Sequence, residues 1–236
     1  MMNRRRFLTI TAAATAGLAA PAALAGPKQV WTGFALGARA SIRLDHPEAR
    51  AIAARAAAEI TRLEGVFSLY RADSALSRLN AEGRLDAPPP ELLQCLTLAG
   101  AVHRASSGAF DPTVQLLWAL WAERATAGTR PTQAELAAAR GRGGWDEVRL
   151  DEAAIAMAPG MALTLNGIAQ GFIGDRVAAL LAAEGLTDIL IDTGEFVALG
   201  QRPDGRAWPV RLAQGGAADL SNRTLATSAP TGTVFD

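Results

Sequence analysis

The chain has 236 residues, of which 50% are hydrophobic and 19% are charged, and it carries 23 basic and 23 acidic side chains. This length and apolar content are enough for one sizeable core, and the balanced charge gives no indication of a nucleic-acid partner. The single cysteine, Cys95, excludes an intramolecular disulfide framework, and the two distant histidines, His46 and His103, do not form a zinc-binding pattern.

Residues 1–25 have the pattern of a twin-arginine export signal. The stretch NRRRFLT is followed by an Ala-rich apolar run, and Ala23-Leu24-Ala25 supplies a small-residue cleavage site. A basic anchor helix is the alternative interpretation. We expect a periplasmic protein that folds within residues 26–236, with a net charge of about −3. No later apolar stretch reaches the roughly 18 residues of a transmembrane span.

Helical patterns dominate the first half of this region. Weak alternation over residues 29–44 predicts an opening strand or hairpin, interrupted at Gly33 and Gly37. A short helix is predicted to begin at an N-cap formed by Asp73 or Ser74. Thr132 is the expected N-cap of a later helix. The other predicted helices cover residues 47–65 and 90–107 and a stretch after residue 112.

Short apolar runs, typical of strands, dominate after Gly143-Gly144. They cover residues 148–150, 155–157, 163–165, 189–191 and 197–199. One long helix is predicted after Gly167 and ends near Gly185, and residues 215–218 are predicted to form a loop. This order of helices and strands indicates one α+β domain rather than a doubly wound dinucleotide fold. Cys95 falls on the apolar face of its helix, which favours a buried structural thiol over a nucleophile.

Five sequence blocks carry polar groups beside glycine or aromatic residues, although no Walker-type or Gly-x-Gly-x-x-Gly phosphate loop occurs. In chain order they are SLYRADSALSRLN, SSGAFDPTVQLLW, LTLNGIAQGFIGD, DILIDTGEFVALG and LATSAPTGTVFD. Together, from about Val30 to Asp236, they resemble the ApbE family of FAD:protein FMN transferases. The export signal, Thr193-Gly194-Glu195 and Ser228-Ala229-Pro230 resemble the NosX branch, which is linked to nitrous oxide reduction. The resemblance implies a T-fold-like arrangement of helices packed on a mainly antiparallel sheet.

The resemblance also implies flavin contacts. Tyr70 corresponds to a flavin-site tyrosine, and Ala109, Phe110 and Asp111 correspond to a flavin-contacting stretch. Tyr70 in the core and Asp111 as the cap of a helix starting at Pro112 are the alternatives. Ser74 and Asn80 are expected to fix their own segment by capping and local hydrogen bonds.

Other positions correspond to the pocket around the FAD pyrophosphate. Leu36 replaces a common methionine, Thr164 a common aspartate and Gln170 a common lysine. The last two changes remove charge and are expected to weaken binding of adenosine and phosphate. Gly167 is expected near the metal and the pyrophosphate because it lacks a Cβ; a tight turn is the alternative.

Asp175 matches an acidic position of the family, where a structural salt bridge competes with a ligand role.

The implied reaction is attack by a Thr or Ser hydroxyl of a client flavoprotein on the FMN-side phosphorus of FAD. AMP is released and Mg²⁺ assists; the sequence does not identify a catalytic base. Because the family's later HxxDPxTG and Asp-x-x-x-Thr motifs do not occur, two interpretations stay open. The chain is a C-terminally truncated transferase, or it is a complete short homologue. Functional alternatives are a non-catalytic periplasmic FAD-binding accessory or assembly protein and a purely structural interaction protein.

Overall fold

The computed structural model describes residues 29–35, 37–44, 46–202, 204–212 and 215–226. The predicted export signal, Leu36 and the block after residue 226 lie outside these described residues, so the predictions made for them stay predictions. None of the described helices is both long enough and apolar enough to cross a membrane.

The chain divides into two compact units. Residues 29–61 and 170–226 belong to the first unit, and residues 62–169 belong to the second. The elements of the first unit are β1 (Gln29–Ala35), β2 (Ala38–Arg43), most of α1 (Ala49–Phe67), α6 (Ala169–Ala183), β6 (Ile189–Asp192), β7 (Phe196–Leu199), β8 (Trp208–Arg211), β9 (Ala217–Leu220) and β10 (Arg223–Leu225).

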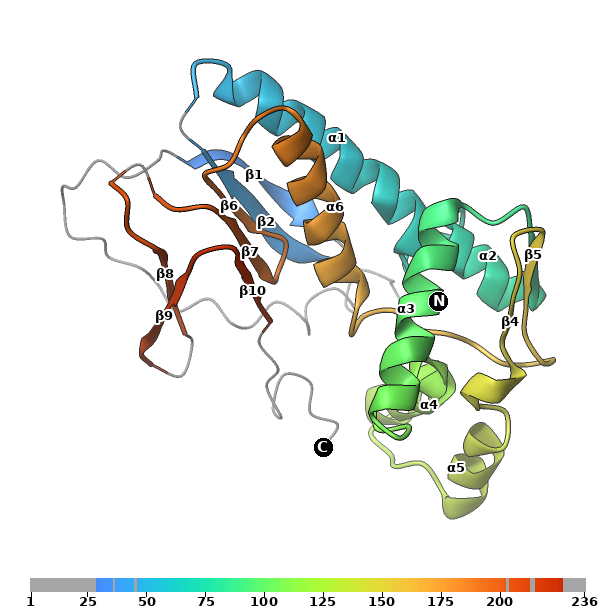
Figure 1. Cartoon of the computed structure of the whole chain (residues 1–236). Coiled ribbons are helices and arrows are strands. Elements are labelled where there is room, and N and C mark those ends of the chain that lie inside the picture. Colours follow the sequence, from blue (N-terminus) through green and yellow to red (C-terminus); the bar gives the residue numbers. More distant parts are fainter. Residues whose placement is uncertain (1–28, 36, 45, 203, 213–214, 227–236) are drawn as a thin grey trace. The chain divides into compact units, whose positions relative to one another are not determined.

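A five-stranded antiparallel sheet, in the order β1-β2-β6-β7-β10, organises the first unit. Gly37, with φ of 84°, makes the β1–β2 turn, as a left-handed backbone conformation suits glycine. Helices α1 and α6 lie side by side along the sheet (Figure 1). Arg55 on α1 donates from Nε to Glu184, which follows α6, at 2.9 Å. The sheet and the two helices therefore form one layered body.

Strand β6 is buried on both faces, which explains its continuous apolar sequence. Leu190 packs with Ala198 and with Trp208, Val210 and Leu220 of the β8–β9 hairpin. Its neighbours Ile189 and Ile191 are also buried, and they point to the opposite face because side chains alternate along a strand. The hairpin thus covers one face of the sheet.

The second unit combines helices with a three-stranded antiparallel sheet in the order β3-β5-β4. Helix α4 packs on α5, and α3 contacts β4. Its elements are α2 (Ala75–Glu82), β3 (Arg84–Asp86), α3 (Pro90–Ala105), η2 (Pro112–Val114), α4 (Gln115–Thr126), α5 (Gln133–Arg140), η3 (Trp145–Glu147), β4 (Arg149–Leu150) and β5 (Ala154–Ala156).

The α+β prediction is confirmed, and several predicted caps are present. Ser74 caps α2 by accepting from the Ser77 amide at 3.0 Å. Thr132 caps α5 in a reciprocal capping box with Glu135. These caps were predictable because each one involves residues at most three positions apart.

Three local predictions are wrong. Residues 163–165 do not form a strand. Their backbone is hydrogen-bonded to the Asn80 side chain and to the Pro112 carbonyl instead of to a neighbouring strand. Ala217 and Ala218 belong to β9 rather than to a loop. Gly33 does not interrupt β1, since it pairs in register with Ala40 and the Trp31 ring covers it.

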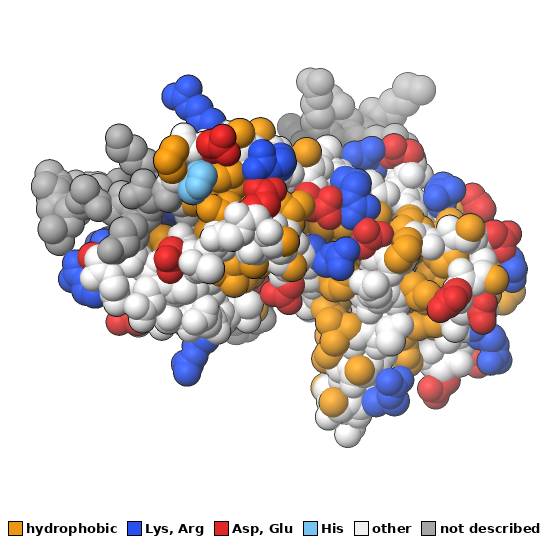
Figure 2. All heavy atoms as spheres, turned by 45° about the horizontal axis from the view of Figure 1, so that its top comes forward, with side chains coloured by type: hydrophobic (Ala, Val, Ile, Leu, Met, Phe, Trp, Pro, Cys, Tyr) orange, Lys and Arg blue, Asp and Glu red, His pale blue; other side chains and the backbone are white. Residues whose placement is uncertain are grey.

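Acidic and basic side chains are interspersed over the visible face of the protein, with apolar side chains between them (Figure 2). Several form surface ion pairs, such as Arg84 with Asp86 at 2.8 Å and Arg71 with Asp73 at 2.9 Å. Pairs of this exposed kind each contribute about 0–1 kcal/mol. The stability of the fold therefore rests on its apolar packing.

Cys95 is fully buried in α3, and burial raises the pKa of its thiol to about 12. Because the thiolate is the reactive form, we expect the native protein not to react with a disulfide-exchange reagent at about pH 8. Unfolding in guanidinium should release one thiol per chain. Rapid labelling of the native protein would contradict this prediction and would restore a reactive role for Cys95.

Candidate functional site

Tyr70 lies on a loop whose backbone is fixed by hydrogen bonds, while its ring stays accessible to solvent. The side chain is 54% exposed, so the alternative that Tyr70 belongs to the core is wrong. The hydroxyl of buried Ser68 accepts from the amides of Tyr70 at 3.1 Å and Arg71 at 3.2 Å. The Ser68 carbonyl accepts from the hydroxyls of Ser74 and Ser77. The loop is therefore anchored to the first turn of α2.

The loop that carries Phe110 is held by two side chains of the preceding segment. His103 bonds through Nδ1 to the Phe110 carbonyl at 2.8 Å, and the Ser106 hydroxyl accepts from the Phe110 amide at 3.0 Å. Between them Ser107 and Gly108 have φ of 53° and 82°, a left-handed backbone that reverses the chain. Phe110 is half-buried and Ala109 is exposed.

Asp111 is an N-cap, as one of its two interpretations predicted. Its Oδ1 accepts from the Thr113 amide and from the Thr113 hydroxyl, both at 2.8 Å. The Thr113 hydroxyl also accepts from the Gly144 amide at 2.9 Å. The cap uses one carboxylate oxygen. Within the described part of the chain Oδ2 has no partner, so the predicted flavin contact remains compatible with capping.

Residues 163–167 form an extended segment and turn beside the Phe110 loop. The Thr164 amide donates to the Pro112 carbonyl at 2.8 Å. A Cβ on Gly167 would lie 3.2 Å from Cε2 of Phe110, closer than ordinary van der Waals contact. The second unit therefore brings together Phe110, Asp111, Thr164 and Gly167, and the aromatic ring gives Gly167 a packing reason to lack a side chain.

Gln170 belongs to the first unit, at the start of α6. Its carbonyl accepts from the hydroxyl of Thr193 at 3.3 Å, and Thr193 is fully buried. A Cβ on Gly171 would lie 2.9 Å from Oε2 of Glu195. The first turn of α6 thus packs closely against the Thr193-Gly194-Glu195 turn.

Three carboxylates in this part of the first unit have raised pKa values. Burial is the main cause for Asp175, Asp192 and Glu195, and the charge of Asp175 raises the pKa of Glu195 further. The Gly194 amide, which donates to Asp192 at 3.0 Å, opposes the shift of Asp192. The salt bridge considered for Asp175 is not found among the described residues.

The raised pKa of Asp192 makes the protein's stability depend on pH. A carboxyl whose folded pKa exceeds its unfolded value contributes stability at low pH that is lost as pH rises through the folded pKa. We expect Asp192→Asn, which keeps an acceptor for Gly194, to raise the urea midpoint at about pH 7. The gain should shrink below about pH 4, where the wild-type carboxyl is protonated too. A gain independent of pH would contradict this cause.

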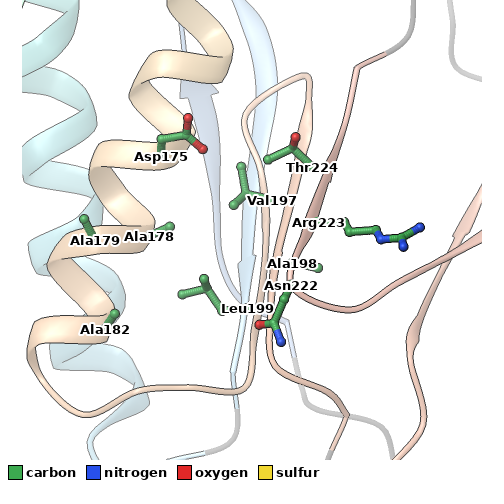
Figure 3. A pocket seen from close by; sticks show the side chains of 10 residues that line it. All are labelled: Asp175, Ala178, Ala179, Ala182, Val197, Ala198, Leu199, Asn222, Arg223 and Thr224. Atoms are coloured by element: carbon green, nitrogen blue, oxygen red, sulfur yellow. The ribbon is translucent and has the colours of Figure 1, made fainter.

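A groove of about 610 Å³ in the first unit lies between α6 and the outer strands of the sheet. Asp175 and three alanines of α6 face β7 across it, and the Arg223 side chain extends away from α6 (Figure 3). None of the predicted flavin-contacting residues lines this groove. We therefore assign no ligand to it.

The described residues do not supply a conventional donor set for a metal. No group of three or more His, Cys, Asp or Glu side chains that could hold an ion occurs among them. Gly167, the predicted metal-site residue, offers only its backbone. We therefore assign no protein ligand to Mg²⁺.

The protein belongs to the ApbE family, whose family model matches residues 36–236. Curated relatives include an FAD:protein FMN transferase of Chlamydia muridarum, 28% identical over 173 residues that cover 70% of this chain and 54% of the relative. Another, from Klebsiella pneumoniae, is 31% identical over 189 residues, or 75% of this chain and 59% of the relative. The chain spans about half the length of the curated relatives it matches.

Solved structures show the same fold. The apo form of the flavinyl transferase ApbE from Pseudomonas stutzeri is similar with a TM-score of 0.76 and 27% identity, covering 88% of this chain and 71% of that one. The flavin transferase ApbE from Vibrio cholerae gives a TM-score of 0.74 at 22% identity, covering 89% and 75%. The implied ApbE-like fold is therefore confirmed.

Two residues that organise the site were not predicted from the sequence. His103 was noted only as a histidine without a metal partner, yet it holds the Phe110 carbonyl. Thr113 connects Asp111 to Gly144. The position of His103 just before the SSGAFDP block was the one signal in the sequence for this role, since a side chain there can reach a residue that follows a tight turn.

Proposed function

We propose that this protein is an FAD:protein FMN transferase that moves FMN from FAD to a Thr or Ser hydroxyl of a client flavoprotein. The proposal is carried by one observation: in the second unit of an ApbE-family chain, the Phe110–Asp111 loop and the Thr164–Gly167 turn are joined by hydrogen bonding and packing. The relatives named above carry this activity in their names.

In this proposal the side chains bind and orient the flavin half of FAD. The exposed ring of Tyr70 offers an aromatic face for the flavin ring system. Asp111 keeps Oδ2 for a ribityl hydroxyl or a ring N–H while Oδ1 maintains the cap. Thr164 is a further proposed contact in the second unit, and the ligand roles that the resemblance implies for Leu36 and Gln170 stay predictions.

The transfer forms a bond between the client hydroxyl oxygen and the FMN-side phosphorus. The bond from that phosphorus to the bridging oxygen breaks, AMP leaves with the bridging oxygen, and the hydroxyl proton passes to a base that we do not assign. The chemistry depends mainly on alignment and charge neutralisation. Mg²⁺ is the metal that the resemblance implies; if bound, it would supply part of that neutralisation, and we include it in the assay.

The direct test uses the protein produced from its natural gene, incubated with FAD, Mg²⁺ and a threonine-bearing client. We expect release of AMP together with a gain in client mass equal to one FMN. A client whose acceptor threonine is replaced by alanine is the control. FAD hydrolysis without a mass gain, or no reaction with bound FAD, would overturn the transferase proposal.

A second candidate function is a non-catalytic FAD-binding accessory or assembly protein. It is favoured by Thr164 and Gln170, which are uncharged at positions where the resemblance implies aspartate and lysine. In the same assay this function predicts retained FAD and no AMP. A purely structural interaction protein would bind no flavin nucleotide.

We also propose that the protein is exported to the periplasm and modifies a client of nitrous oxide respiration. The support is the NRRRFLT stretch with its cleavage site and the Thr193-Gly194-Glu195 variant. Fractionation of cells that produce the full chain should place the mature form, beginning near Gly26, in the periplasm. A version without residues 1–25 should stay in the cytoplasm, and a periplasmic location of that version would contradict the export route.

Tyr70→Ala should weaken FAD binding while leaving stability nearly unchanged. Aromatic contacts contribute about 0.5–1.5 kcal/mol, so we expect Kd to rise up to about tenfold. Exposed positions change unfolding free energy by less than about 0.5 kcal/mol. The measurement is a flavin-fluorescence titration, with Leu98→Ala on α3, 47% exposed, as the control of similar exposure. Equal Kd values for the two variants would remove Tyr70 from the flavin site.

A further inference from the structure

Asn80 makes its hydrogen bonds to a distant segment rather than to its own. Its side-chain amide donates from Nδ2 to the Leu163 carbonyl at 2.8 Å, and its Oδ1 accepts from the Leu163 amide at 2.8 Å. The two residues are 83 positions apart. The expectation that Asn80 stabilises its own segment by local bonds is therefore wrong.

This pair of bonds takes the place of a neighbouring strand. Residues 161–165 alternate between buried and half-buried positions as a strand does, yet they join none of the sheets formed by the described residues. The side-chain amide of Asn80 has one donor and one acceptor for the C=O and N–H of Leu163, as a residue on a neighbouring strand would have in a β-ladder. Asn80 thus fixes Leu163 in an extended conformation directly before Thr164.

Helix α2 connects the candidate flavin contacts of the second unit. Its first turn holds the Tyr70 loop, since Ser74 and Ser77 both donate to the Ser68 carbonyl. Its last turn holds Leu163 through Asn80. The next residue, Thr164, donates to Pro112, which adjoins Asp111. One short helix therefore carries the Tyr70 loop at one end and the Thr164–Gly167 turn at the other.

We propose that Asn80 is a positioning residue for the flavin site, which sets the Thr164–Gly167 turn relative to the Tyr70 and Phe110 loops. It acts through Leu163 and need not touch the ligand. The inference rests on the proposed function in that it takes FAD as the ligand. It concerns binding, however, and does not require that FMN be transferred.

The decisive variant is Asn80→Asp, because it converts the amide into a group that titrates. An ionised carboxylate accepts from the Leu163 amide but places its second oxygen against the Leu163 carbonyl. A protonated carboxyl has the amide's donor and acceptor and restores both bonds. The carbonyl should therefore raise the pKa of the introduced carboxyl above its ordinary value of about 3.9. The site should be correctly positioned at low pH and lose its position as pH rises through the raised pKa.

The experiment measures Kd for FAD from about pH 8 down to about pH 4.5 for the wild type and for Asn80→Asp. Relative to the wild type at each pH, the variant should bind about tenfold more weakly at the upper end and approach wild-type affinity at the lower end. Asn222→Asp is the matched control. Among the described residues, the bond that the Asn222 side chain makes is through Oδ1, which accepts from the Gly200 amide at 2.7 Å, so aspartate keeps that bond at every pH.

The following outcomes decide the inference. A folded Asn80→Asp protein with wild-type Kd throughout, or a loss that does not recover at low pH, would overturn it. If the variant does not fold at the upper pH, the recovery at low pH still tests it. FAD binding by the wild type without transfer would overturn the proposed function and leave Asn80 in its role. Failure of the wild type to bind FAD would overturn both.

Discussion

Leu79→Ala is expected to lower the free energy of unfolding by about 2–5 kcal/mol, the range for a leucine truncated in a close-packed core. Leu79 is fully buried in α2, together with Leu76. It lies next to Asn80, and its carbonyl accepts from the amide of Gly83, the C-cap. The cavity would therefore loosen the helix that carries both the Tyr70 loop and the Asn80 contact. We expect weaker FAD binding as well as a lower urea midpoint.

Arg78→Ala is the matched control for this prediction. Arg78 is exposed in the same helix, and alanine keeps its helix propensity, so the free energy of unfolding should change by less than about 0.5 kcal/mol. FAD affinity should stay at the wild-type value. Equally small effects of the two substitutions would show that the buried face of α2 contributes little to stability or to FAD binding. The helix would then not be the element that positions the flavin contacts.

Local features of the fold could be predicted because their information lies within a few residues. Ser74 and Thr132 are caps whose partners, Ser77 and Glu135, follow within the first turn of the helix. The edge strands could not be predicted in the same way. Strand β8 contains Pro209, and a proline within a short run argues against a strand. It is tolerated here because β8 is an edge strand, whose one partner in the described part of the chain is β9.

The wrongly predicted strand at residues 163–165 shows that an alternating apolar pattern does not by itself establish pairing with another strand. Its alternating burial is real and reflects an extended backbone. Its partners are the Asn80 side chain and the Pro112 carbonyl, and no periodicity reports which distant side chain will take the place of a strand. For the same reason the contact by which Asn80 joins two blocks could not be predicted, although the order of the blocks indicated the family correctly.

Gly100→Ala is expected to destabilise the second unit by about 1–3 kcal/mol, the usual cost of overpacking a core. A Cβ on Gly100 would lie 2.8 Å from Cζ2 and Nε1 of Trp145, and this ring is almost fully buried. The indole must therefore move. Its neighbour Gly144 donates to Thr113, which in turn bonds to Asp111. The centroid of the Trp145 ring also lies 6.1 Å from that of His103, which holds Phe110.

The displacement should thus reach both the Asp111 cap and the Phe110 loop, and FAD affinity should fall along with stability. Gly65→Ala is the opposite control, since no described atom outside its adjacent residues and its own helical backbone lies within 4 Å of its added Cβ. At that helical position alanine should stabilise the protein by about 0.5–1 kcal/mol without changing FAD binding. Urea midpoints, tryptophan fluorescence and FAD titrations of the two variants separate the causes. If Gly100→Ala lowers stability but leaves Kd unchanged, the contacts from Trp145 do not govern the flavin contacts.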